Sequence, residues 1–134
     1  MGEDWTIKYL AQTWEEVGGC WGLYQACVKD RLNITLPIFP AVSISDMRFL
    51  VNMIKKKQAE AQDWVETSNP VEGDCVAMSS IHNVFNHVGY YMKGGYVLHS
   101  TRKCNTGVSK LSHLNLLGYK EYKIYKHEKF NRDS

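Results

Sequence analysis

The sequence of 134 residues contains no apolar run long enough to cross a membrane. Its first residues, MGEDWTIKYLAQTW, also contain neither the basic segment nor the apolar segment of a signal peptide. We therefore expect a chain that is made in the cytosol and has no membrane span. Such a protein would need a route other than ordinary secretion to act outside the cell.

Strong charge and paired cysteines are also absent. The formal net charge is only +2 and no basic stripe is present, so we expect no nucleic-acid partner. No two cysteines form a CxxC pair, which disfavours a zinc site or a redox dithiol, and a cytosolic origin disfavours disulfides. We expect neither a metal nor another cofactor. The cysteines are Cys20, Cys27, Cys75 and Cys104.

The composition is that of one folded domain. Hydrophobic residues make up 44% of the chain and aromatic residues 12%, which argues against disorder. The length is typical of one domain and allows a core that needs no disulfide or metal. We expect a single domain over residues 1–134, with its core at about residues 5–126 and a short polar tail.

The first part of the chain has helical patterns. Residues 4–17 carry large apolar side chains at mostly helical spacing, and Gly18 and Gly19 then interrupt the pattern. A second helix is predicted over about residues 20–32, and Asn33 can end it. The inward stripe of this second helix consists of Cys20, Leu23, Tyr24, Cys27 and Val28.

A third helix is predicted after an extended linker at residues 36–40. Ser43 and Asp46 have the spacing of a capping box, which marks a helix start. The helix is expected to run to about Glu66. Its inward positions are Met47, Leu50, Val51 and Ile54.

The second half of the chain changes to short strand patterns. A turn cluster at residues 68–74 comes first. Because helices come first and antiparallel strands follow, we expect an α+β fold with a C-terminal antiparallel sheet of about four to six strands. The strand-like runs are residues 75–78, 87–92, 96–100 and 119–126.

Two histidines flank a glycine turn, His87 and His99. A three-residue loop at residues 92–94 would pair Tyr91 with Gly95 and place the two histidines directly opposite each other, with Cβ atoms roughly 5 Å apart. The other face of this hairpin would be apolar and pack on the core. Its predicted pairs are Val88 with Leu98 and Tyr90 with Tyr96.

Such a histidine pair has three interpretations. The two side chains can be polar surface residues, or they can be metal ligands. A metal site would need further ligands, and neither Cys104 nor His113 lies at a recognisable ligand spacing. In the third interpretation one histidine is a base and the other orients it, which requires a nucleophile.

Cys20 is the best nucleophile in the sequence. At a predicted helix N-terminus, the dipole and free backbone N–H groups lower the pKa of a thiol, and a neighbouring imidazolium would lower it further. The glycines before Cys20 allow a sharp turn, Gly22 allows close packing, and the Cys20 N–H can bind an oxyanion. Cys27 and Cys75 are expected to be core residues, and Cys104 has no assigned role.

Four segments resemble, in order and over about residues 5–126, the NlpC-type cell-wall cysteine peptidases, particularly those of bacteriophage tails. They are CWGLYQACVKDRLNITLP, NPVEGDCVAM, HVGYYMKGGYVLHST and GVSKLSHL with the strand after it.

The resemblance implies a papain-like α+β core, with the nucleophile helix packed on the antiparallel sheet. Carried over to this chain, Cys20 is the nucleophile, His87 is the general base, and His99 orients His87. The family often has an upstream tyrosine near the oxyanion site; Tyr9 matches it only approximately, and a core role for Tyr9 stays open. Gly19 stands where many members have an acidic residue.

The resemblance also implies a cysteine endopeptidase that cleaves peptidoglycan stem peptides, commonly between D-glutamate and a diamino acid. A phage tail-tip form would be a virion component made in the host cytoplasm. It would dock on tail hub proteins and open the cell wall during DNA delivery. The alternatives are a structural tail-tip protein with a vestigial or plugged site, a metal-binding module, and a papain-like acyltransferase or amidase.

Overall fold

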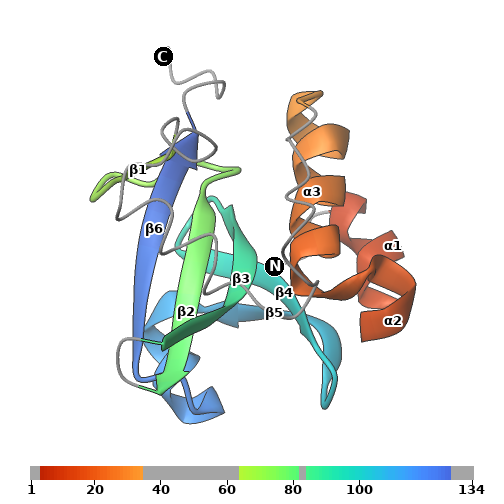
Figure 1. The fold of residues 1–134 in the computed structure, drawn as a ribbon. Coiled ribbons are helices and arrows are strands. Elements are labelled where there is room, and N and C mark those ends of the chain that lie inside the picture. The colour runs from red at the N-terminus through yellow and green to blue at the C-terminus, as the bar shows by residue number, and fades with distance from the viewer. Residues whose placement is uncertain (1–3, 35–63, 82–83, 128–134) are drawn as a thin grey trace.

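The computed structural model describes residues 4–34, 64–81 and 84–127 (Figure 1). The helical elements are η1 (Asp4–Thr6), α1 (Ile7–Leu10), α2 (Trp14–Val17), α3 (Gly19–Leu32) and η3 (Leu111–Leu117). The strands are β1 (Trp64–Glu66), β2 (Cys75–Ile81), β3 (Val84–Met92), β4 (Tyr96–Thr101), β5 (Asn105–Lys110) and β6 (Glu121–His127). No helix in these three ranges is long and apolar enough to span a membrane.

The six strands form one antiparallel sheet in the order β1-β6-β2-β3-β4-β5. Helices α1 to α3 lie together on one side of it, with α3 next to β3 and β4 (Figure 1). The main core fills the space between α3 and the sheet, and a smaller apolar cluster that includes Leu114 of η3 lies apart from it. This arrangement confirms the expected α+β, papain-like fold.

Helix α3 follows its prediction closely. Gly18 and Gly19 precede and begin it with φ angles of 82° and 79°, a left-handed conformation that glycine adopts without strain. Asn33 ends the helix with φ of 56°. The whole predicted stripe is buried, so the 3.6-residue period identified the face that packs on the sheet. Its members are Cys20, Leu23, Tyr24, Cys27 and Val28.

The prediction of one helix over residues 4–17 was wrong. The segment forms η1, α1 and α2, with a break at residues 11–13. A capping box causes the new start: the Glu16 N–H donates to Thr13 Oγ1 at 3.2 Å, and the Thr13 N–H donates to Glu16 Oε1 at 2.8 Å. The Thr-x-x-Glu spacing of residues 13–16 is the sequence signal for this helix start.

The predicted third helix was wrong at its end. Residues 64–66 form strand β1, which pairs with β6 through Val65 and Lys126. The pairing continues where the Thr67 N–H donates to the Ile124 carbonyl oxygen at 2.8 Å. These backbone bonds to a distant strand override the local helical pattern. The linker at 36–40 and the helix positions 43–63 lie outside the described residues.

All four predicted strands are present with somewhat different bounds, the last beginning at Glu121 rather than Tyr119. Strand β5 and helix η3 were not predicted. The β5 sequence NTGVSK contains asparagine, glycine and serine, which have little intrinsic preference for strands. It becomes a strand because it pairs with β4 along its whole length.

The predicted hairpin register was also wrong, although the predicted faces were right. Met92 pairs with Tyr96, so the loop is 93–95, and Tyr91 pairs with Val97 instead of Gly95. The loop moves because both Gly94 and Gly95 adopt positive φ angles, 94° and 88°. A displacement by two residues leaves each side chain on its own face of the sheet.

Candidate active site

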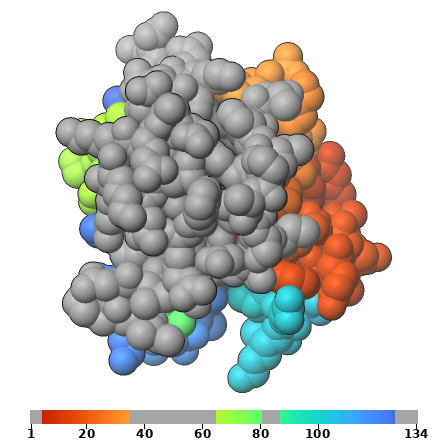
Figure 2. Space-filling model, viewed as in Figure 1, coloured from red at the N-terminus to blue at the C-terminus, as the bar shows by residue number. Residues whose placement is uncertain are grey.

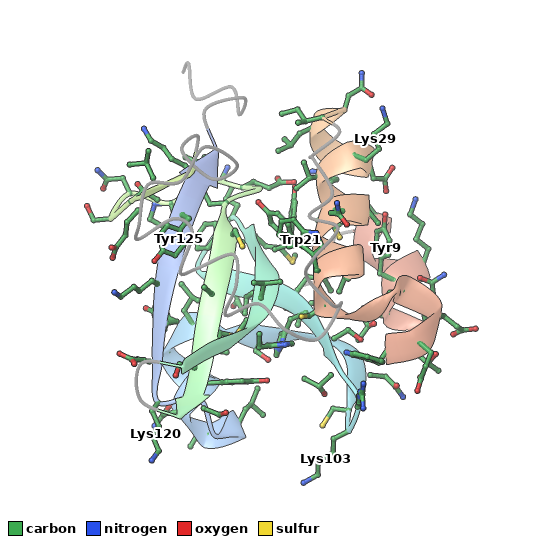
Figure 3. The ribbon with its side chains drawn as sticks, in the orientation of Figure 1. Tyr9, Trp21, Lys29, Lys103, Lys120 and Tyr125 are labelled. Carbon is green, nitrogen blue, oxygen red and sulfur yellow. The ribbon has the colours of Figure 1, made fainter. Side chains whose placement is uncertain are left out.

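The Cys20 thiol lies at the beginning of α3, where the helix meets the sheet. Its side chain is buried, at 3% exposure. Backbone N–H groups of Val88, Trp21 and Cys20 itself lie near enough to lower the pKa of the thiol. Figure 3 shows Trp21, the next residue, pointing from α3 toward the strands. The sulfur therefore sits among donors from both the helix and β3.

His87 on β3 and His99 on β4 form a direct pair. Nε2 of His87 lies 2.8 Å from Nδ1 of His99, and both rings are buried. The other ring nitrogen of His99, Nε2, lies 3.0 Å from Oγ of Ser109 on β5. Since His87 uses Nε2 for this pair, its Nδ1 is the nitrogen left for a thiol.

Gly89 makes this close approach possible. A Cβ at this position would lie 2.4 Å from Val97 Cγ2 and 3.0 Å from the Cβ of His99. Any larger residue would therefore push His99 or Val97 away. The missing side chain at Gly89 is what lets the two imidazoles meet diagonally across the hairpin.

Tyr119, just after η3, fixes the plane of the His87 ring. The two rings are parallel to within 5°, with centroids 5.3 Å apart. The Tyr119 N–H donates to the Leu114 carbonyl oxygen at 3.2 Å, which anchors this residue to η3. His87 is thus held by a hydrogen bond at one edge and an aromatic ring on one face.

Cys20 and His87 line the same open cleft, which has a volume of about 290 Å³. The sequence proposed a nucleophile and a base 67 positions apart, and the fold brings both to one surface hollow. Together with the histidine pair, this places all three residues predicted to be catalytic at one site. The described lining residues are Trp14, Cys20, Ser80, His87, Thr101, Arg102, Leu117 and Tyr119.

The rim of the cleft joins α2 to the turn between β4 and β5. The Arg102 guanidinium lies 4.4 Å from the centre of the Trp14 ring, a cation–π contact. The backbone N–H of Trp14 donates to Asn105 Oδ1 at 3.1 Å, and Asn105 has a φ angle of 60°. Figure 2 shows this hairpin tip in light blue beside the red and orange helices. Arg102 is therefore a positioned charge at the cleft.

Burial sets the protonation states of the site. It raises the pKa of the Cys20 thiol to about 11, outweighing the nearby N–H groups. Burial also lowers the pKa of His87 to about 3, with a smaller effect of His99, and that of His99 to about 4. The expectation of a lowered thiol pKa was wrong: the resting site holds a neutral thiol and neutral imidazoles.

Tyr9 does not lie at an oxyanion site. Its hydroxyl donates to Asp30 Oδ2 at 3.1 Å, and Asp30 is ten residues beyond Cys20, or about 15 Å along α3. Figure 3 places Tyr9 on the α1 side of α3. The ring belongs to the main core, so Tyr9 has the core role that the sequence left open.

Of the other three cysteines, two were expected to be core residues and no role was assigned to the third. All four thiols are unbridged, Cys27 and Cys75 are buried in the main core as expected, and Cys104 is exposed.

Within the part of the chain that the structure describes, no three acidic, histidine or cysteine side chains are arranged to hold a metal ion. The third interpretation of the histidine pair, a base with its orienter, fits the geometry best.

Several residues at the site were not identified from the sequence. Trp14, Arg102, Ser109 and Tyr119 come from four segments, and no local pattern links them to His87. Ser109 could have been found only by pairing β5 with β4, since the alternation then puts it on the same face as His99. Tyr119 could not, because η3 determines its position.

A helix-borne thiol and a strand-borne imidazole pair at one cleft, on an antiparallel sheet, define the class of papain-like α+β proteins with a thiol–imidazole site. The family model for the NlpC/P60 family matches residues 9–122, and the chain belongs to this family. Its members are generally cysteine peptidases that act on peptidoglycan. A comparison with curated proteins gives no significant match.

Proposed function

We propose that this protein is a cysteine endopeptidase that cleaves the stem peptides of peptidoglycan. The observation that carries the proposal is the common cleft of Cys20 and His87, in which His99 occupies Nε2 of His87 and leaves Nδ1 as the nitrogen that can accept a proton from the thiol. Membership of the NlpC/P60 family supports the reaction class and the substrate class.

The reaction begins from a neutral pair. The proton of the Cys20 thiol passes to His87 Nδ1 as the sulfur attacks the carbonyl carbon of the scissile amide. The backbone N–H of Cys20 stabilises the oxyanion that forms. The C–N bond breaks, and the leaving amine takes the proton from His87. Water then hydrolyses the thioester: its proton goes to His87 and from there to the thiol, and the acid product leaves.

The charge at the rim supports a substrate that carries carboxylates. Arg102 is fixed beside Trp14 at the cleft, and a guanidinium pairs well with a carboxylate. Stem peptides contain such groups near the bond between D-glutamate and a diamino acid. We propose that this bond is the one cleaved.

Digestion of purified peptidoglycan tests the activity directly. Wild-type protein should release fragments whose masses show the new amine and carboxylate termini. Cys20→Ala should release none, whereas Cys104→Ser, which changes an exposed cysteine, should match the wild type. Equal release by the wild type and Cys20→Ala would refute the enzymatic proposal, as would release by neither.

We further propose that the protein is a component of a phage tail tip, docked on hub proteins, that acts in the cell envelope of the host. The Cys-Trp-Gly-Leu sequence at the nucleophile supports this form. A phage carrying Cys20→Ala should assemble normal particles that infect poorly. Unchanged infectivity would instead favour the structural alternative, a tail-tip protein with a vestigial or plugged site.

A further inference from the structure

Both ring nitrogens of His99 have a partner. Nδ1 faces His87 Nε2 at 2.8 Å, and Nε2 faces Ser109 Oγ at 3.0 Å. His99 is only 6% exposed, so an unpaired N–H on its ring would be costly. The three side chains come from the neighbouring strands β3, β4 and β5 and form one chain of hydrogen bonds across the sheet.

A neutral imidazole carries one proton, so the chain can be arranged in only two ways. In the first, His87 Nε2–H donates to His99, and His99 Nε2–H donates to Ser109. In the second, every bond is reversed: Ser109 donates to His99, His99 donates to His87, and the proton of His87 is on Nδ1. Only the first arrangement leaves a lone pair on His87 Nδ1 to accept the thiol proton.

The proton transfer from the thiol also requires the first arrangement. Once His87 has accepted a proton at Nδ1, it carries N–H groups at both nitrogens, so His99 must accept at Nδ1. The proton of His99 is then on Nε2 and needs an acceptor, and Ser109 Oγ is the atom in place. No proton moves between the two histidines during this step.

We propose that Ser109 is a positioning residue of the site: by accepting a hydrogen bond from His99, it holds the histidine pair in the one tautomer in which His87 can act as a base. This inference rests on the proposed function, since it gives Ser109 a role in that reaction. Loss of the hydroxyl leaves a buried N–H without its acceptor and thereby favours the reversed arrangement.

The tautomer of His99 can be read without any catalysis, from ring ¹H–¹⁵N correlation spectra of the full chain labelled in histidine. Wild type should show the His99 proton on Nε2. In Ser109→Ala it should move wholly or partly to Nδ1, and Ser109→Thr, which keeps the hydroxyl, should restore the wild-type signal. If peptidoglycan is cleaved, Ser109→Ala should lower kcat about tenfold, the effect of one neutral hydrogen bond, with KM within about twofold.

Thr106→Val is the matched control. Thr106 donates to Ser100 Oγ at 3.0 Å between the same two strands, and it is also buried, but strand alternation puts its side chain on the opposite face of the sheet from His99. This variant should leave the tautomer and kcat unchanged. The proposal is overturned if Ser109→Ala keeps the wild-type tautomer of His99, or if Ser109→Thr is altered as much as Ser109→Ala. A wild type that leaves peptidoglycan intact would refute the proposed function, while the spectra would still report on Ser109.

Discussion

His99 lies between two glycines that are not equivalent. Gly89 on β3 leaves no room for a Cβ. At Gly107 on β5, which pairs with His99, a Cβ would have no atom within 4 Å apart from those of Gly107 and its two neighbours in the chain. Gly107 also lacks a positive φ angle. Replacing each glycine with alanine therefore tests whether the site needs a glycine only where a methyl group would clash with neighbouring atoms.

We expect Gly89→Ala to lower the free energy of unfolding by about 1–3 kcal/mol, because the methyl overlaps Val97 and pushes His99. Peptidase activity should fall with it. Gly107→Ala should change the stability by no more than about 0.5 kcal/mol. Urea unfolding of the two variants measures the difference. Equal stability of the pair would mean that the strands move apart at Gly89 without cost.

The protonation state of Cys20 gives a second prediction at this scale. Because burial raises the pKa of the thiol to about 11, its alkylation rate by a small neutral reagent should rise about tenfold per pH unit through the neutral range. Labelling followed by mass spectrometry between about pH 6 and about pH 10 measures this rate. Cys27, with a pKa raised to about 12 by burial, is the internal reference. A plateau for Cys20 at neutral pH would reveal a thiolate–imidazolium pair instead.

At the scale of the element, the start of α3 depends on Gly22. A Cβ there would lie 2.5 Å from the carbonyl oxygen of Val17, at the end of α2. The close packing predicted for this glycine is thus a contact between two consecutive helices. Its effect reaches the cleft, since α2 also carries Trp14.

Gly22→Ala tests this contact by the sign of its effect. Helix propensity alone would stabilise the variant by about 1 kcal/mol, but we expect destabilisation because the methyl meets a backbone oxygen. The exposed site Ala26 gives the size of the propensity effect in the same helix, since Ala26→Gly should cost about 1 kcal/mol. Thermal unfolding compares the two variants. A more stable Gly22→Ala would show that α2 moves away freely.

For the whole molecule, the two buried histidines link stability to acid. Their pKa values, about 3 for His87 and about 4 for His99, lie below the ordinary value of about 6.5 that applies in the unfolded chain. Above that pH both states hold neutral rings and nothing changes. Below it the unfolded chain takes up protons that the folded chain does not, so the folded state loses stability as the pH falls.

The free energy of unfolding should therefore fall by up to about 2.7 kcal/mol per pH unit between about pH 6 and about pH 5, above the range in which most carboxylates titrate. Urea unfolding at several pH values measures this slope. The double variant His87→Gln/His99→Gln should have a clearly flatter slope, whatever its stability at neutral pH. An equal slope in the two proteins would mean that the rings are charged in the folded state.

Some residues of the site could be predicted from the sequence and others could not. Cys20 was placed at a helix start by Gly18 and Gly19, and His87 and His99 were placed on one face by strand alternation. Both are properties of neighbouring residues in the chain. Ser109 and Tyr119 were missed because they reach the histidines through β5 and η3, and neither element has a local pattern strong enough to predict.

The sequence by itself determined α3 with its buried stripe, the α+β order of elements, the shared face of the two histidines, and the family resemblance. These depend on residue period and motif order, which the tertiary structure does not alter. Only the tertiary structure decided the hairpin register, the strand at 64–66, the partners of His99, and the neutral state of the thiol. Each of these depends on backbone pairing or burial between distant segments, and the desolvation of Cys20 is a property of everything packed around it.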